Sequence, residues 1–255
     1  MRLHCESFGA GPDVVLLHGW GWHGGVWDDV ARALARDFRV WVPDLPGHGR
    51  SREAITTFTL DSLAQAVSTC VPRAAAWMGW SLGGLVTVTA AQRGDVQRMV
   101  LVGTTPRFVE DTDWHCGLSR QWFSEFTEEV ARDATHALER FASLHLTGDG
   151  NERPLLRRLR TALSQHAVPD LSALQTGLCV LETSDLRSQL SALRVPALVV
   201  HGASDRIVSC DAGKRLAQAL PQARFESVVG AGHALFLSHQ DLFMNSIGAF
   251  LREQV

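Results

Sequence analysis

Gly79-Trp80-Ser81-Leu82-Gly83 is the most informative stretch of this 255-residue chain. The apolar run 74–78 before it predicts a short buried strand, and Gly84–Ala91 after it predicts a helix that begins beside the serine. Strand, sharp turn and helix together are the setting in which G-x-S-x-G forms a nucleophile elbow. Glycines allow the backbone to double back, so that the serine hydroxyl is exposed. The motif by itself leaves a second interpretation open, in which Ser81 only caps the helix.

Strands and helices alternate on both sides of this motif. The predicted strands are 13–17, 38–42, 74–78, 99–103, 195–202 and 224–229, and the predicted helices are 26–36, 60–71, 84–91, 212–220 and a last one that ends near 250. Continuous apolar strands such as 13–17 are typical of a parallel sheet that is buried on both faces. The pattern therefore predicts the α/β class, with a mostly parallel, doubly wound sheet.

The alternation breaks between about Thr105 and Leu190, where two stretches have apolar residues at helical spacing. This spacing predicts one helix over 122–146, a break at Gly148–Asn151 and a second helix over 154–167. We expect a core of residues 1–105 and 191–255, with a helical cap of residues 106–190 inserted between two strands. Because ligands bind beyond the carboxyl ends of strands in such sheets, the cap is expected to lie there.

The bulk properties narrow the range of functions. A formal net charge of −3 gives no argument for a nucleic acid or membrane partner, and no apolar run reaches transmembrane length. The start of the chain has no apolar signal core, and the five scattered cysteines lack metal-ligand spacing, so we expect a cytoplasmic protein. Glycine patterns that bind phosphate do not follow any predicted strand. No metal or organic cofactor is implied.

Three polar residues follow predicted strands, in the order Ser81, Asp205, His233. Serine is a poor nucleophile without a base, His233 could take and return its proton, and Asp205 could fix the tautomer of the imidazole. Each residue also has a simpler interpretation, since Asp205 could stabilise a turn and His233 is one of eleven histidines. The joint pattern favours a catalytic triad.

An oxyanion hole would need two N–H donors near Ser81. The candidates are the backbone N–H of Leu82 and that of Trp20, in the loop after the first buried strand. His18 could be a second base, but a structural histidine packed on the elbow is favoured. Asp44 and His48 lie in a stretch rich in turn-forming residues, where a turn-stabilising role is favoured.

These residues belong to motifs that resemble the α/β-hydrolase superfamily, namely those at 16–21, 44–51, 79–85 and 232–234. The tryptophan-rich form of the motifs is similar to the pimeloyl-[acyl-carrier protein] methyl ester esterases of biotin synthesis, and the similarity extends over nearly the whole chain. The resemblance implies a sheet of about eight strands. It also implies a serine carboxylesterase that removes the methyl group of the ester, through an acyl-enzyme, while the acyl chain is attached to its carrier protein.

The resemblance also assigns roles to residues. It implies the triad Ser81, Asp205 and His233, oxyanion donors at Trp20 and Leu82, and an acyl-chain channel along Phe141, Ala142, Ser143, Leu144 and His145. Two positions depart from the family, because His145 replaces an expected neutral amide and His136 an expected arginine. The implied partners are an acyl carrier protein bearing the ester and small-molecule esters, bound by a monomer.

Carrier docking would need a local basic surface, because acyl carrier proteins are acidic. Arg153, Arg157 and Arg160 fall in one sector of the second predicted cap helix, and the resemblance places carrier contacts at Arg140, Arg153 and Arg157. An ordinary solvated helix face would have the same pattern.

Other functions of the same fold stay open at this stage. A serine nucleophile also suits a general short-chain carboxylesterase, a lipase, a carbon–carbon bond hydrolase, a cofactor-free haloperoxidase or an acyltransferase. A non-catalytic receptor of this fold is disfavoured, because all three triad residues are present.

Overall fold

The structure, a computed structural model, describes residues 3–52, 58–73, 75–146, 152–164 and 168–253. These residues form one seven-stranded sheet, whereas the resemblance led us to expect about eight strands. The strand order is β1-β3-β2-β4-β5-β6-β7, and every neighbouring pair is parallel except β1 with β3. The strands are β1 (Cys5–Phe8), β2 (Asp13–Leu17), β3 (Arg39–Pro43), β4 (Ala75–Trp80), β5 (Val96–Val102), β6 (Ala197–Gly202) and β7 (Ala223–Val228). The predicted α/β class and mostly parallel sheet are confirmed.

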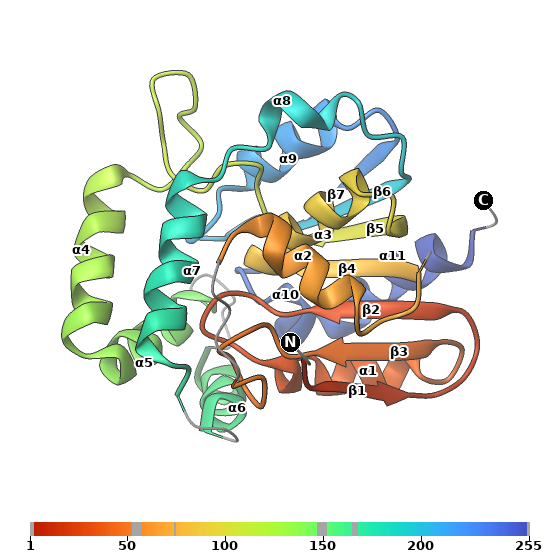
Figure 1. The fold of residues 1–255 in the computed structure, drawn as a ribbon, viewed down its shortest axis with the longest axis horizontal. Coiled ribbons are helices and arrows are strands. Elements are labelled where there is room, and N and C mark those ends of the chain that lie inside the picture. Colours follow the sequence, from red (N-terminus) through yellow and green to blue (C-terminus); the bar gives the residue numbers. More distant parts are fainter. Residues whose placement is uncertain (1–2, 53–57, 74, 147–151, 165–167, 254–255) are drawn as a thin grey trace.

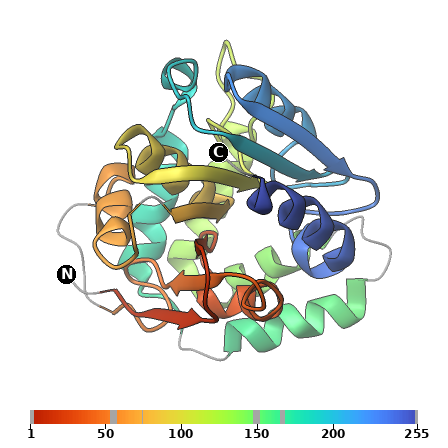
Figure 2. The ribbon, with the colours of Figure 1, turned by 90° about the vertical axis from the view of Figure 1, so that its right-hand side faces the viewer.

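Helices cover both faces of this sheet (Figures 1 and 2). Those of the core are η1 (Gly24–Trp27), α1 (Asp28–Leu34), α2 (Leu60–Ser68), α3 (Leu82–Gln92), α9 (Cys210–Ala219), α10 (Leu235–Ser238) and α11 (Gln240–Arg252). Alternate strand residues enter two separate hydrophobic clusters. Val15 and Leu17 pack with α2, α3 and α9 on one face, and Val14 and Leu16 pack with α1 and α11 on the other. This two-sided burial explains why the strands are continuously apolar.

The segment between β5 and β6, called the cap here, is helical, as its sequence predicts. It contains α4 (Arg120–Arg132), α5 (Ala134–Leu144), α6 (Glu152–Ser164), α7 (Leu171–Thr183) and α8 (Arg187–Leu190). In Figure 1, α4 to α7 gather at one end of the sheet, whereas α8 lies beside α9. The prediction of a single helix over 122–146 is wrong. Asp133 ends α4 with φ −151° and ψ 89°, and its side chain accepts a hydrogen bond from the backbone N–H of His136 at 3.0 Å. Aspartate favours such a capping position over a helix interior.

Two other differences concern the ends of the cap helices. The helix break predicted at Gly148–Asn151 lies outside the described residues, as does the predicted helix end at 165–167. The sequence pattern also missed α7 and α8, and β1 at the edge of the sheet.

Within the part of the chain that the structure describes, no helix is both long and apolar enough to cross a membrane.

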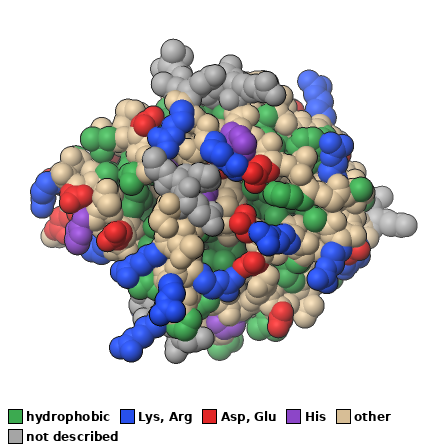
Figure 3. Space-filling model, turned by 90° about the horizontal axis from the view of Figure 1, so that it is seen from below, with side chains coloured by type: hydrophobic (Ala, Val, Ile, Leu, Met, Phe, Trp, Pro, Cys, Tyr) green, Lys and Arg blue, Asp and Glu red, His purple; other side chains and the backbone are tan. Residues whose placement is uncertain are grey.

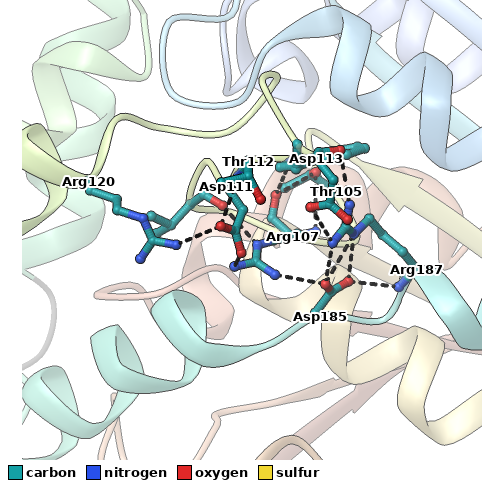
Figure 4. Close-up of polar contacts among 10 residues, drawn as sticks. Thr105, Arg107, Asp111, Thr112, Asp113, Arg120, Asp185 and Arg187 are labelled. Carbon is teal, nitrogen blue, oxygen red and sulfur yellow. Dashed lines mark hydrogen bonds and ion pairs between the residues drawn. The ribbon is translucent and has the colours of Figure 1, made fainter.

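An ionic network joins the two chain segments at the base of the cap (Figure 4). Arg107, on the outgoing segment, donates to Asp185 on the returning segment at 2.8 Å, and also to Asp111 at 2.5 Å. Arg187 donates to Asp185 at 2.7 Å and to Asp113 at 3.1 Å. The two ends of the inserted segment are therefore fastened to each other beside the sheet.

Candidate active site

Ser81 occupies a strained turn between β4 and α3. Its φ of 55° and ψ of −117° make it the only non-glycine residue with positive φ in the described part of the chain. The turn is closed so tightly that a Cβ atom on Gly79 would lie 2.1 Å from the carbonyl oxygen of Gly83. Strain of this kind in a non-glycine residue persists only where the surrounding structure enforces it, and such residues cluster at functional sites. Ser81 therefore has the geometry of an elbow and not that of an ordinary helix cap.

His233 and Asp205 form a buried pair beside this turn. His233 Nδ1 lies 2.7 Å from Asp205 Oδ2, and both side chains are inaccessible to solvent. The indole N–H of Trp80, the residue before Ser81, donates to the carbonyl oxygen of His233 at 3.0 Å. This bond connects the elbow to residues 229–234, called the histidine loop here. His233 Nε2 has no hydrogen-bond partner among the described residues. Catalytic hydrogen bonds are often long before substrate binds, so this ring nitrogen is available for a proton from a nearby hydroxyl.

The carboxylate of Asp205 is held in its charged form. Burial alone would raise its pKa, but the bonded His233 and the neighbouring His201 outweigh burial and hold the pKa well below its usual value. Asp205 Oδ1 also accepts backbone N–H bonds from Ile207 at 2.8 Å and Val208 at 2.9 Å. An ionised carboxylate on His233 Nδ1 leaves Nε2 as the basic nitrogen of the ring.

The peptide bond between Gly19 and Trp20 has a fixed orientation. Its carbonyl oxygen lies 2.8 Å from His18 Nδ1 and accepts a bond from the N–H of Trp22 at 3.3 Å. Leu45 donates its N–H to His18 Nε2 at 2.9 Å, so the proton of the neutral ring is on Nδ1 and is donated to Gly19. Because C=O and N–H point in opposite directions across a trans peptide, the N–H of Trp20 faces away from His18.

His18, His48 and Asp44 make structural contacts. Burial, aided by the neighbouring His48, lowers the pKa of His18 to about 3, so it is not a base at neutral pH. His48 Nε2 accepts the N–H of Gly21 at 3.3 Å. Asp44 accepts the N–H groups of Gly24 at 2.7 Å and Arg50 at 2.9 Å. These side chains brace the loops around the elbow.

The predicted acyl-channel stretch lies at the end of α5, and only part of it is close to the candidate triad. His145 is buried, with its ring centroid 5.1 Å from that of His233, and Phe141 packs on it at 4.5 Å. Phe141 also contacts Trp20. Ala142 is buried in the second hydrophobic cluster, while Ser143 and Leu144 are half-buried.

His145 takes the place of the neutral amide that the family resemblance led us to expect. Its Nδ1 lies 2.7 Å from the carbonyl oxygen of Phe141, and its Nε2 accepts the indole N–H of Trp22 at 3.2 Å. Burial, with His233 nearby, lowers its pKa to about 3. A neutral imidazole with one donor and one acceptor can make the same two kinds of hydrogen bond as an amide.

The arginines expected to contact a carrier differ in their surroundings. Arg140 is paired with Glu129 on α4, through a bond of 2.9 Å from Nε. Arg153, Arg157 and Arg160 have no hydrogen bond or ion pair within the described ranges, and all three are exposed. They line a pocket of about 660 Å³ that is also lined by Gly21 and Leu138. In Figure 3 the side of the molecule that carries α6 shows Lys and Arg side chains with Asp and Glu among them.

Sequence reasoning missed His201, a fully buried histidine at the end of β6 that contacts Asp205. Its position four residues before Asp205, at the end of the same strand, was the available signal. No cluster of His, Cys, Asp or Glu suited to a metal ion occurs in the ranges that the structure covers.

Comparison with known proteins agrees with this geometry. Residues 12–240 match the alpha/beta hydrolase fold family. A pimeloyl-[acyl-carrier protein] methyl ester esterase of Nitrosomonas europaea is 39% identical over 249 residues, which cover 97% of this chain and 98% of that protein. The protein of the same name from Xanthomonas campestris pv. campestris is 38% identical over 250 residues, 98% of each chain.

Solved structures show the same fold. A bromoperoxidase from Bacillus anthracis superposes with a TM-score of 0.91 at 23% identity, covering 98% of this chain and 95% of that one, and at this identity the likeness shows the fold alone. The enol-lactonase from Burkholderia xenovorans superposes with a TM-score of 0.85 at 26% identity, covering 98% and 96% of the two chains.

Proposed function

We propose that this chain, which belongs to the α/β-hydrolase fold family, is a carboxylic ester hydrolase that acts on the methyl ester of pimeloyl-[acyl-carrier protein] in biotin synthesis. The observation that carries the proposal is the buried His233–Asp205 pair beside the strained Ser81, in a chain nearly 40% identical along its whole length to esterases of that name. The bromoperoxidase and lactonase likenesses do not favour a competing substrate, because a shared fold hosts many reactions.

In the proposed mechanism, Ser81 Oγ attacks the ester carbonyl while its proton passes to His233 Nε2. The imidazolium that forms is stabilised by Asp205. The oxyanion is held by the N–H of Trp20 and by the N–H of Leu82, which is at the first turn of α3 and has no hydrogen-bond partner among the described residues. The His233 imidazolium then gives its proton to the departing methoxide, which leaves as methanol. Water, deprotonated by His233, releases the pimeloyl group as a carboxylate and restores Ser81.

The acyl chain is proposed to run along the aromatic wall that joins the elbow loop to the cap. Phe141 and Phe126 both pack edge-on against Trp20, with centroid distances of 5.4 and 5.5 Å. This wall is apolar, as a methylene chain requires. Of the five residues assigned to the channel, we give Phe141 and His145 direct contact with substrate, and we assign Ala142, Ser143 and Leu144 to holding the end of α5.

We further propose residues 106–190 as a cap unit on a core of 1–105 and 191–255, with α6 as the carrier-docking element. Leu155 and Leu159 bury one side of α6 against the core, and Arg158 pairs with Asp29. This packing turns Arg153 and Arg157 outward around the pocket that reaches Gly21. Arg140 is the weaker candidate because Glu129 neutralises it. Action in the cytoplasm and a monomeric state remain predictions.

The decisive experiment compares one ester in two forms. Pimeloyl methyl ester attached to acyl carrier protein should be hydrolysed with a kcat/KM well above that of the free ester, and methanol should appear in equal amount to the new carboxylate. Equal rates on the two forms would leave a general short-chain carboxylesterase. Labelling of Ser81 by a fluorophosphonate separates both from a non-catalytic receptor, which would not react.

A further inference from the structure

His201 is a buried polar residue that touches the proposed triad but has no part in the mechanism above. It lies at the carboxyl end of β6, is fully inaccessible to solvent, and places Nε2 3.3 Å from Asp205 Oδ2 and 2.9 Å from the carbonyl oxygen of Val208. Two oxygen acceptors face the same ring nitrogen. Nε2 must therefore carry a proton, since an unprotonated nitrogen would set its lone pair against both oxygens.

The rest of the ring is fixed from behind by α9. His201 Nδ1 has no hydrogen-bond partner in the part of the chain that the structure describes, and a Cβ atom at Gly213 would lie 2.2 Å from it. The ring thus fills a slot that exists only because residue 213 has no side chain. It has no room to move away from Asp205.

With His201 included, four N–H groups surround the carboxylate of Asp205. Oδ1 accepts from the N–H groups of Ile207 and Val208, and Oδ2 is bonded to His233 at 2.7 Å and lies 3.3 Å from His201 Nε2. A carboxylate with donors on both oxygens cannot rotate about its last side-chain bond without breaking hydrogen bonds, and buried unpaired groups are costly.

We infer that His201 is a positioning residue for the proposed triad: it shares Asp205 Oδ2 with His233 and so fixes the plane of the carboxylate and the charge that it presents to His233. This inference rests on the proposed function, because it assigns the Asp205–His233 pair to catalysis. It does not depend on which ester is the substrate.

The test uses a short p-nitrophenyl ester and the variants His201→Leu and His201→Gln. Leucine removes the donor, whereas the glutamine amide can supply an N–H close to the position of Nε2. His201→Leu should lower kcat by roughly 10- to 100-fold, as expected for a misplaced catalytic pair, with KM changed less than about twofold. His201→Gln should recover most of the loss.

The pH profile separates positioning from a merely structural role. When Oδ2 loses one donor, more of its negative charge faces His233, which stabilises the imidazolium. The acidic limb of kcat/KM should therefore move to higher pH in His201→Leu, by roughly half a unit, and return in His201→Gln. The other titratable ring that faces His233 is His145, and it is unchanged in both variants.

A second variant covers the case in which His201→Leu folds poorly. Gly213→Ala adds a methyl group against His201 Nδ1 while leaving every polar group of the triad in place. Gly213→Ala should lower kcat in the wild-type background. In the His201→Gln background it should lower kcat no further, because the flexible glutamine side chain can move away from the added methyl group. The effects of the two substitutions on kcat should therefore be non-additive.

The outcomes distinguish the two proposals. If Asp205→Asn retains the wild-type rate, the proposed catalytic site is wrong. If Asp205→Asn is disabled while His201→Leu keeps the wild-type kcat and pH limb, the role of His201 alone is overturned. Equal kcat losses in His201→Leu and His201→Gln with an unmoved limb would also overturn it.

Discussion

The loops behind Ser81 and the outer face of α6 hold their ionisable groups in opposite ways. Behind Ser81 the ionisable groups are buried and bonded to the chain itself, as His145 and His233 show. On α6, Arg153 and Arg157 are exposed and have no partner among the described residues. The behaviour of buried ionisable groups depends on pH, because desolvation shifts their pKa. The behaviour of exposed charges depends on ionic strength, because salt screens them. The first region should be sensitive to pH and the second to salt.

The largest expected effect is the loss of the nucleophile, which should affect all substrates alike. Ser81→Ala should lower kcat by at least ~10³-fold on both carrier-bound and free esters, since no other group can form the acyl-enzyme. Steady-state kinetics on both substrates measures it. Esterase activity close to wild type in this variant would show that the candidate site is wrong, and with it the contrast between the two regions.

The next effect tests the pH sensitivity of the buried region. The pKa of His145 is about 3 in the folded protein, below the value of about 6.5 expected when unfolded. As the pH falls from 6.5 towards 3, His145 is therefore protonated in the unfolded state but not in the folded state. The free energy of unfolding decreases over that pH range. At pH 5 the loss from one such histidine is about 2 kcal/mol.

His145→Gln should remove that contribution, so urea unfolding between pH 7.5 and pH 5 should lose about 2 kcal/mol less than in wild type. His136→Gln, at an exposed position of α5, serves as the control. An unchanged pH dependence in His145→Gln would mean that His145 is protonated in the folded protein.

A smaller effect tests the salt sensitivity of α6. Reversing both Arg153 and Arg157 to glutamate should raise KM for the carrier-bound ester roughly tenfold, because two exposed ion pairs contribute up to about 1 kcal/mol each. The salt dependence of kcat/KM should flatten, while a free p-nitrophenyl ester is hydrolysed as before.

The matched control reverses Lys214 and Arg215 on α9, which changes the net charge equally on a different surface. If this control raises KM as much, long-range charge and not a docking face is responsible. Equal losses on both esters in the α6 variant would mean that the arginines support the structure of the cap.

The smallest expected effect is that of replacing Arg187, which belongs to the ionic network at the base of the cap. Arg187 is bonded to Asp185 and Asp113 within the chain, so Arg187→Ala should affect stability and not docking. We expect a loss of about 1 kcal/mol, or a fall in Tm of about 2–4 °C, with KM for the carrier-bound ester unchanged. A rise in KM without a change in Tm would contradict this assignment.

Sequence predicted the core better than the cap for physical reasons. Buried parallel strands and the elbow leave local signals, which is why β2 and the turn at Ser81 were placed correctly. The division of one predicted helix at Asp133 was missed, because apolar spacing continues through a capping residue whose aspartate bonds to the next turn. The spacing of His201 and Asp205 along the chain hinted at their contact, but the packing of His201 against Gly213 was missed because Gly213 comes from another element.

One backbone hydrogen bond joins the cap to the histidine loop: the N–H of Ala234 donates to the carbonyl oxygen of His145, at the end of α5, at 3.1 Å. The residue next to His233 therefore cannot keep its native bond if α5 lifts from the core. Local opening of the cap and loss of the aligned base are expected to be one event, with one free energy. The rate of deuterium exchange at the Ala234 amide would measure how often the cap opens. It would therefore report the fraction of time in which a folded molecule is unable to react.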